Sequence, residues 1–283
     1  MHIPVLQKEV LQYLDPKPNE NFIDCTIGEG GHALIILERN KPNGKVLGID
    51  RDPKQIENCK LKIENFKDRL IIVNDSYTNL KKIVEKYSFG SVSGILFDLG
   101  MSSWHLEESG RGFTFLRDEP LDMRYNLVND LTAEKIVNQW PEPEIVRILE
   151  EYGQERFARR IAKKIIKERP IKTTLQLVEA LKKAKIYQPR QTFQALRIAV
   201  NDELNNLKKA LPRATEVLER GGRIVVISFH SLEDKIVKNF FKNSTLKVLL
   251  NVLTKKPIIP SEEELKNNPR SRSAKLRAAV KVC

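Results

Sequence analysis

Short apolar runs alternate with longer amphipathic segments over the first hundred residues. Each run has the length and composition of a buried strand, and each intervening segment has the periodicity of a helix. The predicted strands are Asn21–Cys25, Lys45–Ile49, Leu70–Asn74 and Gly94–Asp98, and the predicted helices are His32–Asn40, Pro53–Phe66 and Asn79–Tyr87. This alternation predicts a parallel sheet with helices on both faces, whose ligands bind at the carboxyl ends of the strands.

The alternation stops after the fourth strand. From about residue 109 to 211 the sequence predicts helices and loops but no strand. The spacing of Thr173 and Gln176 matches a capping box, which predicts a helix over 173–185, and a further helix is predicted over 193–211. This stretch therefore differs in structural class from the residues before it.

Strand character returns near the C-terminus. An apolar run predicts a strand at Gly222–Phe229, and the spacing of Ser231 and Asp234 predicts a capping box that begins a helix through Phe241. The last two apolar runs, Leu246–Leu253 and Lys275–Val282, are expected to pair as an antiparallel hairpin.

The order of these elements predicts two domains. Residues 1–108 and 211–283 are expected to form one discontinuous α/β domain with a mostly parallel sheet. Residues 109–210 are expected to form an inserted, all-helical domain.

The segment Arg156–Arg169 predicts a helix with two distinct faces. Its apolar side carries Phe157, Ala158, Ile161, Ala162, Ile165 and Ile166, and its basic side carries Arg159, Arg160, Lys163, Lys164 and Lys167. Acidic residues are nearly absent from the basic side. Two interpretations stay open, a solvated surface and a surface that faces phosphates.

Composition narrows the class of protein. The chain has 283 residues, 41% hydrophobic and 30% charged, which is enough for one large domain or two modest ones. No apolar run is long enough to span a membrane, and the N-terminal sequence Met-His-Ile-Pro lacks the pattern of a signal peptide. Cys25, Cys59 and Cys283 have neither zinc-ligand spacing nor a paired framework, so we expect a cytoplasmic protein without a structural metal.

The charge is strongly positive, with 49 Lys and Arg against 37 Asp and Glu and a formal net charge of +12. A basic protein suits a polyanionic partner, because neutralised phosphates release counterions. The acids gather near the glycine-rich loop while the bases gather elsewhere, which favours nucleic acid as the partner.

A glycine-rich loop follows the first predicted strand. Gly28, Gly30 and Ala33 match the spacing of a dinucleotide-binding loop, and Asp50 lies where a carboxylate can accept hydrogen bonds from ribose hydroxyls. Both NAD(P) and S-adenosylmethionine fit this pattern. Acids surround the loop and end successive strands, at Asp24, Glu29, Asp50, Asp75 and Asp98. Because S-adenosylmethionine is cationic and has no phosphate, these acids favour the methyl donor.

Nine segments, which follow one another in the same order as in a known family, carry a resemblance to that family. They lie at residues 24–32, 48–53, 97–103, 111–115, 120–124, 152–160, 192–197, 228–235 and 268–273. Together they resemble the ribosomal RNA small subunit methyltransferase H family, also called MraW, over nearly the whole chain.

The resemblance implies a class I methyltransferase, or Rossmann-like, sheet with an inserted helical domain that recognises the substrate. It implies S-adenosylmethionine as cofactor and N4-methylation of a cytosine in the decoding centre of 16S rRNA, cytosine 1402, within the small ribosomal subunit. The cofactor contacts that it implies fall on Gly30, Gly31, His32, Asp50, Tyr77, Asp98 and His105. The aromatic ring of Tyr77 gives adenine a face on which to stack.

Asp98 is the candidate catalytic residue, because a carboxylate there can accept a hydrogen bond from the target amino group. Its alternative role is to hold the cofactor. Trp104 or Phe113 could stack on a base that has left its helix, and Phe113 fits a core position equally well.

Further polar side chains have two interpretations each. The loop residues Arg111, Arg117, Asp122 and Arg124 could contact RNA or form internal salt bridges. His230 could cap a helix or contact substrate. The C-terminal bases Arg270, Arg272, Lys275 and Arg277 could contact phosphates or protect an edge strand.

Two other functions use the same features. An NAD(P)-dependent oxidoreductase shares the sheet, although a proton-donating group for hydride transfer is not evident in the sequence. A basic, non-catalytic protein of ribosome assembly would need the charge but not the intact glycine loop.

Overall fold

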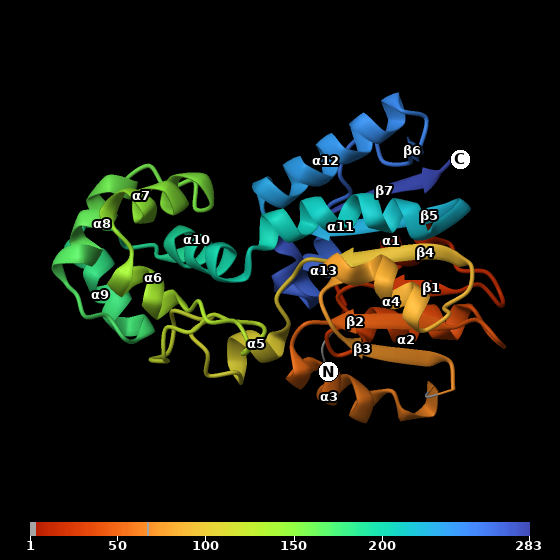
Figure 1. Cartoon of the computed structure of the whole chain (residues 1–283), viewed down its shortest axis with the longest axis horizontal. Helices are drawn as coiled ribbons and strands as arrows, with labels where there is room; N and C mark the ends of the chain where they lie inside the picture. The colour runs from red at the N-terminus through yellow and green to blue at the C-terminus, as the bar shows by residue number, and fades with distance from the viewer. Residues whose placement is uncertain (1–3, 67) are drawn as a thin grey trace. The chain divides into compact units, whose positions relative to one another are not determined.

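The computed structural model describes residues 4–66 and 68–283, so the Met-His-Ile N-terminus lies outside the described residues. Contacts divide the chain into two compact units (Figure 1). The sheet unit runs to Gly100 and resumes at Leu204–Cys283, and the helical unit is Met101–Glu203. The predicted insertion, 109–210, begins and ends later than the helical unit. The difference at its end arises because Leu207, Ala210 and Leu211 pack in the core of the sheet unit.

Within the described residues, seven strands form one sheet in the order β3-β2-β1-β4-β5-β7-β6. They are β1 (Phe22–Asp24), β2 (Val46–Asp50), β3 (Leu70–Asn74), β4 (Val92–Asp98), β5 (Leu218–Ser228), β6 (Leu250–Val252) and β7 (Lys275–Lys281). Strands β1 to β5 are parallel, and β7 is antiparallel to both β5 and β6. The predicted α/β class, the four early strands and the antiparallel end are confirmed.

Alternate residues of the strands enter two separate hydrophobic cores, as the pleat of a strand requires. Ile95 and Phe97 of β4 belong to one core, while Leu96 between them belongs to the other. Helices α1 (Gln7–Leu14), α2 (Gly31–Arg39) and α3 (Pro53–Lys62) contribute to the core of Leu96. Helices α4 (Leu80–Lys86), α11 (Glu203–Val217) and α12 (Ser231–Leu246) contribute to the other. The sheet is therefore buried on both faces.

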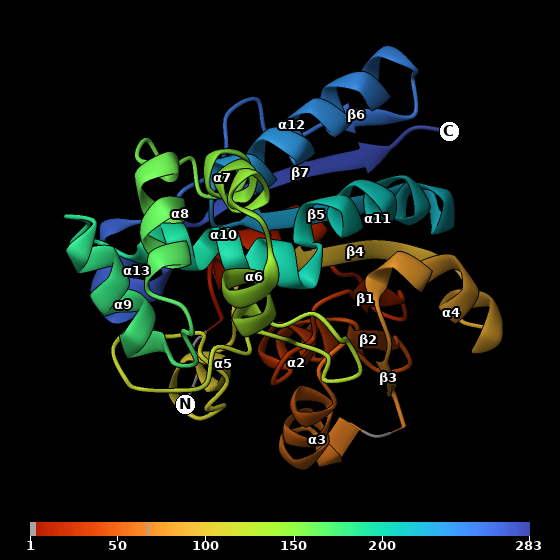
Figure 2. The same ribbon diagram turned by 60° about the vertical axis from the view of Figure 1, so that its left-hand side comes forward.

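Several predicted boundaries in the sheet unit were wrong. The helix that starts at Pro53 ends at Lys62 and is followed by the 3-10 turn η1 (Glu64–Phe66). Helix α12 continues to Leu246, which leaves β6 only three residues, and Figure 2 shows α12 running beside β6 and β7. The remaining elements of this unit are η2 (Tyr77–Asn79), α13 (Glu262–Asn267) and η3 (Pro269–Ser273).

The helical unit has its own hydrophobic core. Its helices are α5 (Ser103–Glu107), α6 (Ala133–Gln139), α7 (Glu142–Glu151), α8 (Ala158–Lys167), α9 (Thr174–Lys183) and α10 (Arg190–Asn201). The predicted absence of strands holds for its residues, apart from an isolated bridge between Pro120 and Thr173. The capping box of Thr173 and Gln176 is confirmed.

The single helix predicted over 193–211 is wrong. The chain forms α10 and then α11, and Asp202 between them adopts a left-handed conformation with φ 49°. A residue in this conformation ends a helix, because the hydrogen-bond ladder cannot continue through it. None of the helices among the described residues is both long and apolar enough to cross a membrane.

Candidate active site

The loop between β1 and α2 requires glycine at Gly30. Its φ is 83°, a left-handed conformation that other residues adopt at a cost. A Cβ atom there would overlap the Ile63 side chain and lie 3.0 Å from Cys59 Sγ. The next residue is similarly confined, because a Cβ on Gly31 would lie 2.7 Å from Pro4 Cγ. The loop thus passes closely between α3 and the N-terminal segment.

Asp50 at the end of β2 is tied to this loop. Its Oδ2 accepts a hydrogen bond from the Gly28 backbone N–H at 3.0 Å, and its Oδ1 accepts one from Asp52 N–H at 2.9 Å. Two backbone donors therefore fix the orientation of the carboxylate beside the glycines.

The ends of the neighbouring strands β1 and β4 are linked through Thr26. Its backbone N–H donates to Asp24 Oδ1 at 3.0 Å, and its hydroxyl oxygen accepts from Asp98 N–H at 2.7 Å. Asp98 Oδ1 also accepts from Gly100 N–H at 3.2 Å. Asp24, Asp50 and Asp98 thus end three adjacent strands at the carboxyl edge of the sheet.

Asp24 has a strongly perturbed acidity. The side chain is only 1% exposed, and burial is the main reason that its pKa rises from 3.8 to about 6. His32 and the Thr26 N–H lower this pKa, while Asp98 and Asp50 raise it further. Two carboxylates that raise the pKa of a third create a negative potential, which a cation bound at this edge would relieve.

His32, in the first turn of α2, lies beside this cluster. It is 6% exposed, and its Nε2 is 3.4 Å from Asp98 Oδ2. Neither ring nitrogen has a hydrogen-bond partner among residues 4–66 and 68–283. A buried polar group without a partner is costly and is typical of functional sites.

Gln55 of α3 shares this property and was missed by the sequence analysis. It is fully buried, and neither atom of its amide has a hydrogen-bond partner within the described chain. A Cβ on Gly28 would lie 3.8 Å from its Oε1, so the amide is next to the glycine loop. The available signal was a polar side chain beside Ile56 on the buried side of α3.

Tyr77 follows β3 in the turn η2. Its ring packs edge-on against Phe97 of β4, with centroids 5.7 Å apart, and the Arg51 guanidinium lies 5.4 Å from its centroid. The aromatic ring is thus held at the same edge of the sheet as Asp98.

Two of the acids that favoured a cationic ligand serve local structure. Asp75 Oδ1 accepts hydrogen bonds from Ser76 N–H at 2.6 Å and from the Asn79 side-chain amide at 2.8 Å. Glu29 pairs with Lys62 of α3. The acids that favour a cationic ligand at this edge are therefore Asp24, Asp50 and Asp98.

Six of the seven predicted cofactor residues lie in the sheet unit, and His105 lies in the helical unit. His105 is 5% exposed, and its Nδ1 is 2.8 Å from Ser102 Oγ. Its ring contacts Trp104, Phe113 and Tyr125, and Phe113 stacks on Tyr125 with centroids 5.1 Å apart. Phe113 is a core residue, as one of its two interpretations held.

The charged loop residues of the helical unit form internal contacts. Arg124 makes a two-pronged salt bridge with Asp122, with distances of 2.8 and 2.7 Å. Arg117 pairs with Glu119 at 3.4 Å, and Arg111 donates to the Arg124 and Tyr125 carbonyls. The interpretation as internal salt bridges thus accounts for Asp122 and Arg124.

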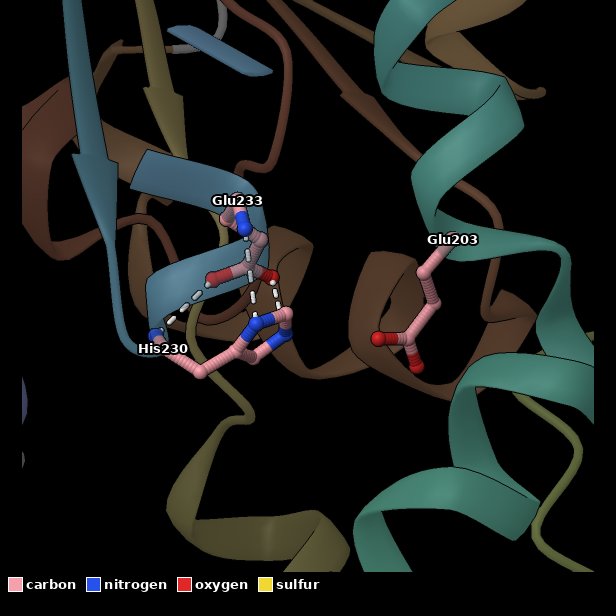
Figure 3. A group of neighbouring side chains, drawn as sticks. All are labelled: Glu203, His230 and Glu233. Carbon is pink, nitrogen blue, oxygen red and sulfur yellow. Dashed lines mark hydrogen bonds and ion pairs between the residues drawn. The ribbon is translucent and has the colours of Figure 1, made fainter. Parts of the chain in front are cut away.

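His230 caps helix α12, which corrects the predicted cap at Ser231. The Glu233 N–H donates to His230 Nδ1, and the His230 N–H donates to Glu233 Oε2, both at 3.4 Å (Figure 3). His230 Nε2 also lies 3.1 Å from Glu233 Oε1. The capping box therefore begins one residue earlier than predicted.

Arg277 is not on an edge strand. It lies in β7, between β5 and β6, is 7% exposed and pairs with Asp234 at 2.7 and 3.1 Å. Arg270 and Arg272 are exposed. The prediction that Arg277 contacts phosphates or protects an edge was therefore wrong.

Comparison with known proteins gives full-length matches. The model of the MraW methylase family matches residues 1–282. The ribosomal RNA small subunit methyltransferases H of Thermotoga neapolitana and Heliobacterium mobile are 49% and 46% identical to the chain. Each alignment covers 99% of this chain, with 96% of the first relative and 99% of the second.

Among solved structures, a candidate rRNA-methylase from Clostridium thermocellum has a TM-score of 0.50, with 16% identity and complete coverage of both chains. This likeness supports the fold alone. The sequence relationship is decisive by itself, and the chain belongs to the MraW methylase family of S-adenosylmethionine-dependent methyltransferases.

Proposed function

We propose that this enzyme transfers a methyl group from S-adenosylmethionine to the exocyclic N4 of a cytosine in 16S rRNA, cytosine 1402 of the decoding centre. The observation that carries the proposal is the full-length match to relatives named ribosomal RNA small subunit methyltransferase H. The small ribosomal subunit is the proposed partner, and the cytoplasm the proposed location.

The residues at the carboxyl edge of the sheet fit a cationic cofactor without phosphates. S-adenosylmethionine supplies an electrophilic methyl group on a positively charged sulfur. We assign Asp50 to the ribose hydroxyls, Tyr77 to the adenine and the carboxylates of Asp24 and Asp98 to the cationic end. The other proposed contacts are Gly30, Gly31, His32 and His105. The buried ring nitrogens of His32, which have no hydrogen-bond partner among the described residues, support its place in this set.

Asp98 has a second proposed role in catalysis. The N4 lone pair of cytosine is delocalised into the ring, so the amine is a weak nucleophile. A carboxylate that accepts a hydrogen bond from this amine orients its lone pair and takes its proton. Positioning can contribute about 7–11 kcal/mol, and general-base help about 10²–10⁴-fold. The hydrogen bond from the Gly100 N–H orients the Asp98 carboxylate for this task.

Asp98→Asn separates the two roles. If Asp98 accepts the proton, kcat falls by roughly 10²–10⁴-fold while the Kd for S-adenosylmethionine changes little. If Asp98 only holds the cofactor, the Kd rises and kcat at saturating cofactor is kept. Titration calorimetry and single-turnover methylation measure the two quantities.

The target nucleotide is tested with small subunits from cells that lack this protein. The purified enzyme and isotopically labelled S-adenosylmethionine should place one methyl group on N4 of cytosine 1402, as measured by mass spectrometry of nuclease fragments. A methyl group on a ring carbon or a ribose would contradict the proposal.

A further inference from the structure

Helix α8 of the helical unit has a basic side that is exposed. Ala158, Ile161, Ala162 and Ile165 are buried in the core of the unit. The opposite side carries exposed Arg159, Arg160, Lys163 and Lys167, and exposed Arg156 lies just before the helix. These five residues are called the α8 basic face.

The stability of the helix does not explain these charges. Arg159 and Arg160 lie in the first turn of α8, where the helix dipole favours acidic residues and disfavours basic ones. The first turn contains no acid. Positive charge at this end therefore opposes helix formation, which points to a role outside folding.

Acidic neighbours do not neutralise the face either. Glu155 is buried and accepts a hydrogen bond from Phe157 N–H at 3.0 Å, while Glu168 pairs with Lys183 and Lys164. Arg159 and Lys163 have no ion-pair partner in the described part of the chain. Helix α7 shows the ordinary arrangement of a solvated surface, because its Arg147 bridges Glu144 and Glu151 at 2.8 and 3.1 Å.

An aromatic ring lies within the same surface. Phe157 was predicted on the apolar side, yet it is 50% exposed at the N-cap of α8. The Arg160 guanidinium lies 4.3 Å from its ring centroid. Proteins that bind single-stranded nucleic acid place exposed aromatic rings among basic side chains. The ring stacks on a nucleobase while the basic side chains contact the neighbouring phosphates.

We propose that the α8 basic face and Phe157 bind a single-stranded stretch of the RNA substrate, with its phosphates on the basic residues and one base stacked on Phe157. The inference rests on the proposed function in that the substrate is RNA. A single strand is specified because bases inside an A-form duplex are stacked on one another and are not accessible to an aromatic side chain.

The test measures the affinity of the full-length protein for a fluorescein-labelled oligouridylate over a series of salt concentrations. Replacing two phosphate contacts, in Arg159→Gln/Lys163→Gln, should reduce the slope of log Kd against log salt by about 1.4, since each contact on a single strand contributes about 0.7. An unchanged slope would overturn the proposal.

Phe157 is tested at constant salt. Loss of one stacked base should weaken binding roughly 5- to 150-fold in Phe157→Leu, which keeps an apolar side chain, without a change in the salt slope. Phe157→Trp should retain the affinity, because it restores a ring. Equal affinity of the Leu variant and the natural protein would refute the stacking contact.

Lys182→Gln is the matched control. Lys182 is an exposed base of the same unit, but Glu179 pairs with it at 2.7 Å, so its loss should leave the salt slope unchanged. A drop of about 0.7, which is the same per charge as in the Arg159 and Lys163 variant, would mean that the slope reports net charge alone and would contradict the proposal.

A second measurement separates this inference from the proposed function. The α8 variants should bind S-adenosylmethionine as the natural protein does and should methylate small subunits with a raised KM for the subunit. An unchanged KM would overturn the inference and leave the methyltransferase assignment intact. Oligouridylate binding with the predicted slopes, but without methylation of any subunit, would leave the inference intact and overturn the proposed function.

Discussion

The two units hold their charged side chains in opposite ways. At the edge of the sheet, Asp24, Asp50 and Asp98 are fixed by backbone N–H groups, and Asp24 is almost fully buried. On α8 the charges are positive and exposed, and Arg159 and Lys163 lack ion-pair partners among the described residues. Carboxylates in fixed orientations suit a small cation bound in one pose, whereas exposed Arg and Lys side chains, which are long and flexible, suit a long polyanion. This difference agrees with the proposals that the sheet unit binds the methyl donor and the helical unit binds RNA.

The largest expected effect is a loss of stability when the tightly packed glycine loop is changed. Gly30→Ala should lower the free energy of unfolding by about 2–5 kcal/mol, because it adds left-handed strain to a steric overlap with Ile63. Gly221→Ala is a matched control, since Gly221 has φ 82° but open space where its Cβ would be. It should cost only the strain, about 1–2 kcal/mol. Equal losses in urea denaturation would show that the loop is not tightly packed.

The burial of Asp24 predicts a pH-dependent stability. Because its folded pKa of about 6 lies above the unfolded value near 3.8, the protonated form favours folding, and this contribution is lost between about pH 4 and pH 6. The ionised group then costs roughly 3 kcal/mol. Asp24→Asn should remove this dependence, so the stability of the variant relative to the natural protein rises over that range. A constant difference from pH 4 to pH 8 would contradict the burial of a carboxylate here.

A helix cap in the helical unit provides a smaller effect. Thr173→Ala removes the side-chain acceptor of the α9 capping box and should cost about 1 kcal/mol. Thr173→Ser keeps the hydroxyl and should cost much less. If the two variants were equally unstable in urea denaturation, the methyl group of Thr173, and not its hydroxyl, would be the stabilising group.

The smallest expected effect concerns the rates at which the three cysteines are alkylated. Cys25 and Cys59 are buried, and burial raises the pKa of Cys59 to about 12, while Cys283 is exposed. Native protein at pH 8 should therefore be alkylated at Cys283 alone, because thiolates are the reactive form. All three cysteines lie in the sheet unit, so reaction at Cys25 or Cys59 reports its opening. Rapid native alkylation of Cys59 would disagree with the packing described for Gly30.

The elements that sequence predicted well depend on local patterns. The strands before residue 100, the capping box at Thr173 and the glycine loop all follow from neighbouring residues. The errors depend on contacts distant in sequence. Arg277 is buried because β7 inserts between β5 and β6, and an order of strands is not visible in periodicity.

Site residues show the same division. The positions of Asp50 and Asp98 at strand ends followed from the alternation of strands and helices. Gln55 was missed because its burial, with no hydrogen-bond partner within the described chain, depends on the path of the glycine loop over α3. The exposure of Phe157 was missed because helical periodicity does not specify the conformation of a residue at the N-cap. The contacts that these residues make with a ligand stay predictions.

Titration calorimetry with S-adenosylmethionine measures whether the carboxyl edge of the sheet binds the methyl donor. We expect saturable binding to the natural protein and a loss of about 100-fold or more in Asp50→Ala, since a charge-assisted pair of hydrogen bonds to ribose is removed. Thermal melting of the variant controls for folding, because Asp50 also accepts from Gly28. Equal binding heats for a folded Asp50→Ala and the natural protein would contradict the assignment of this edge of the sheet to the methyl donor.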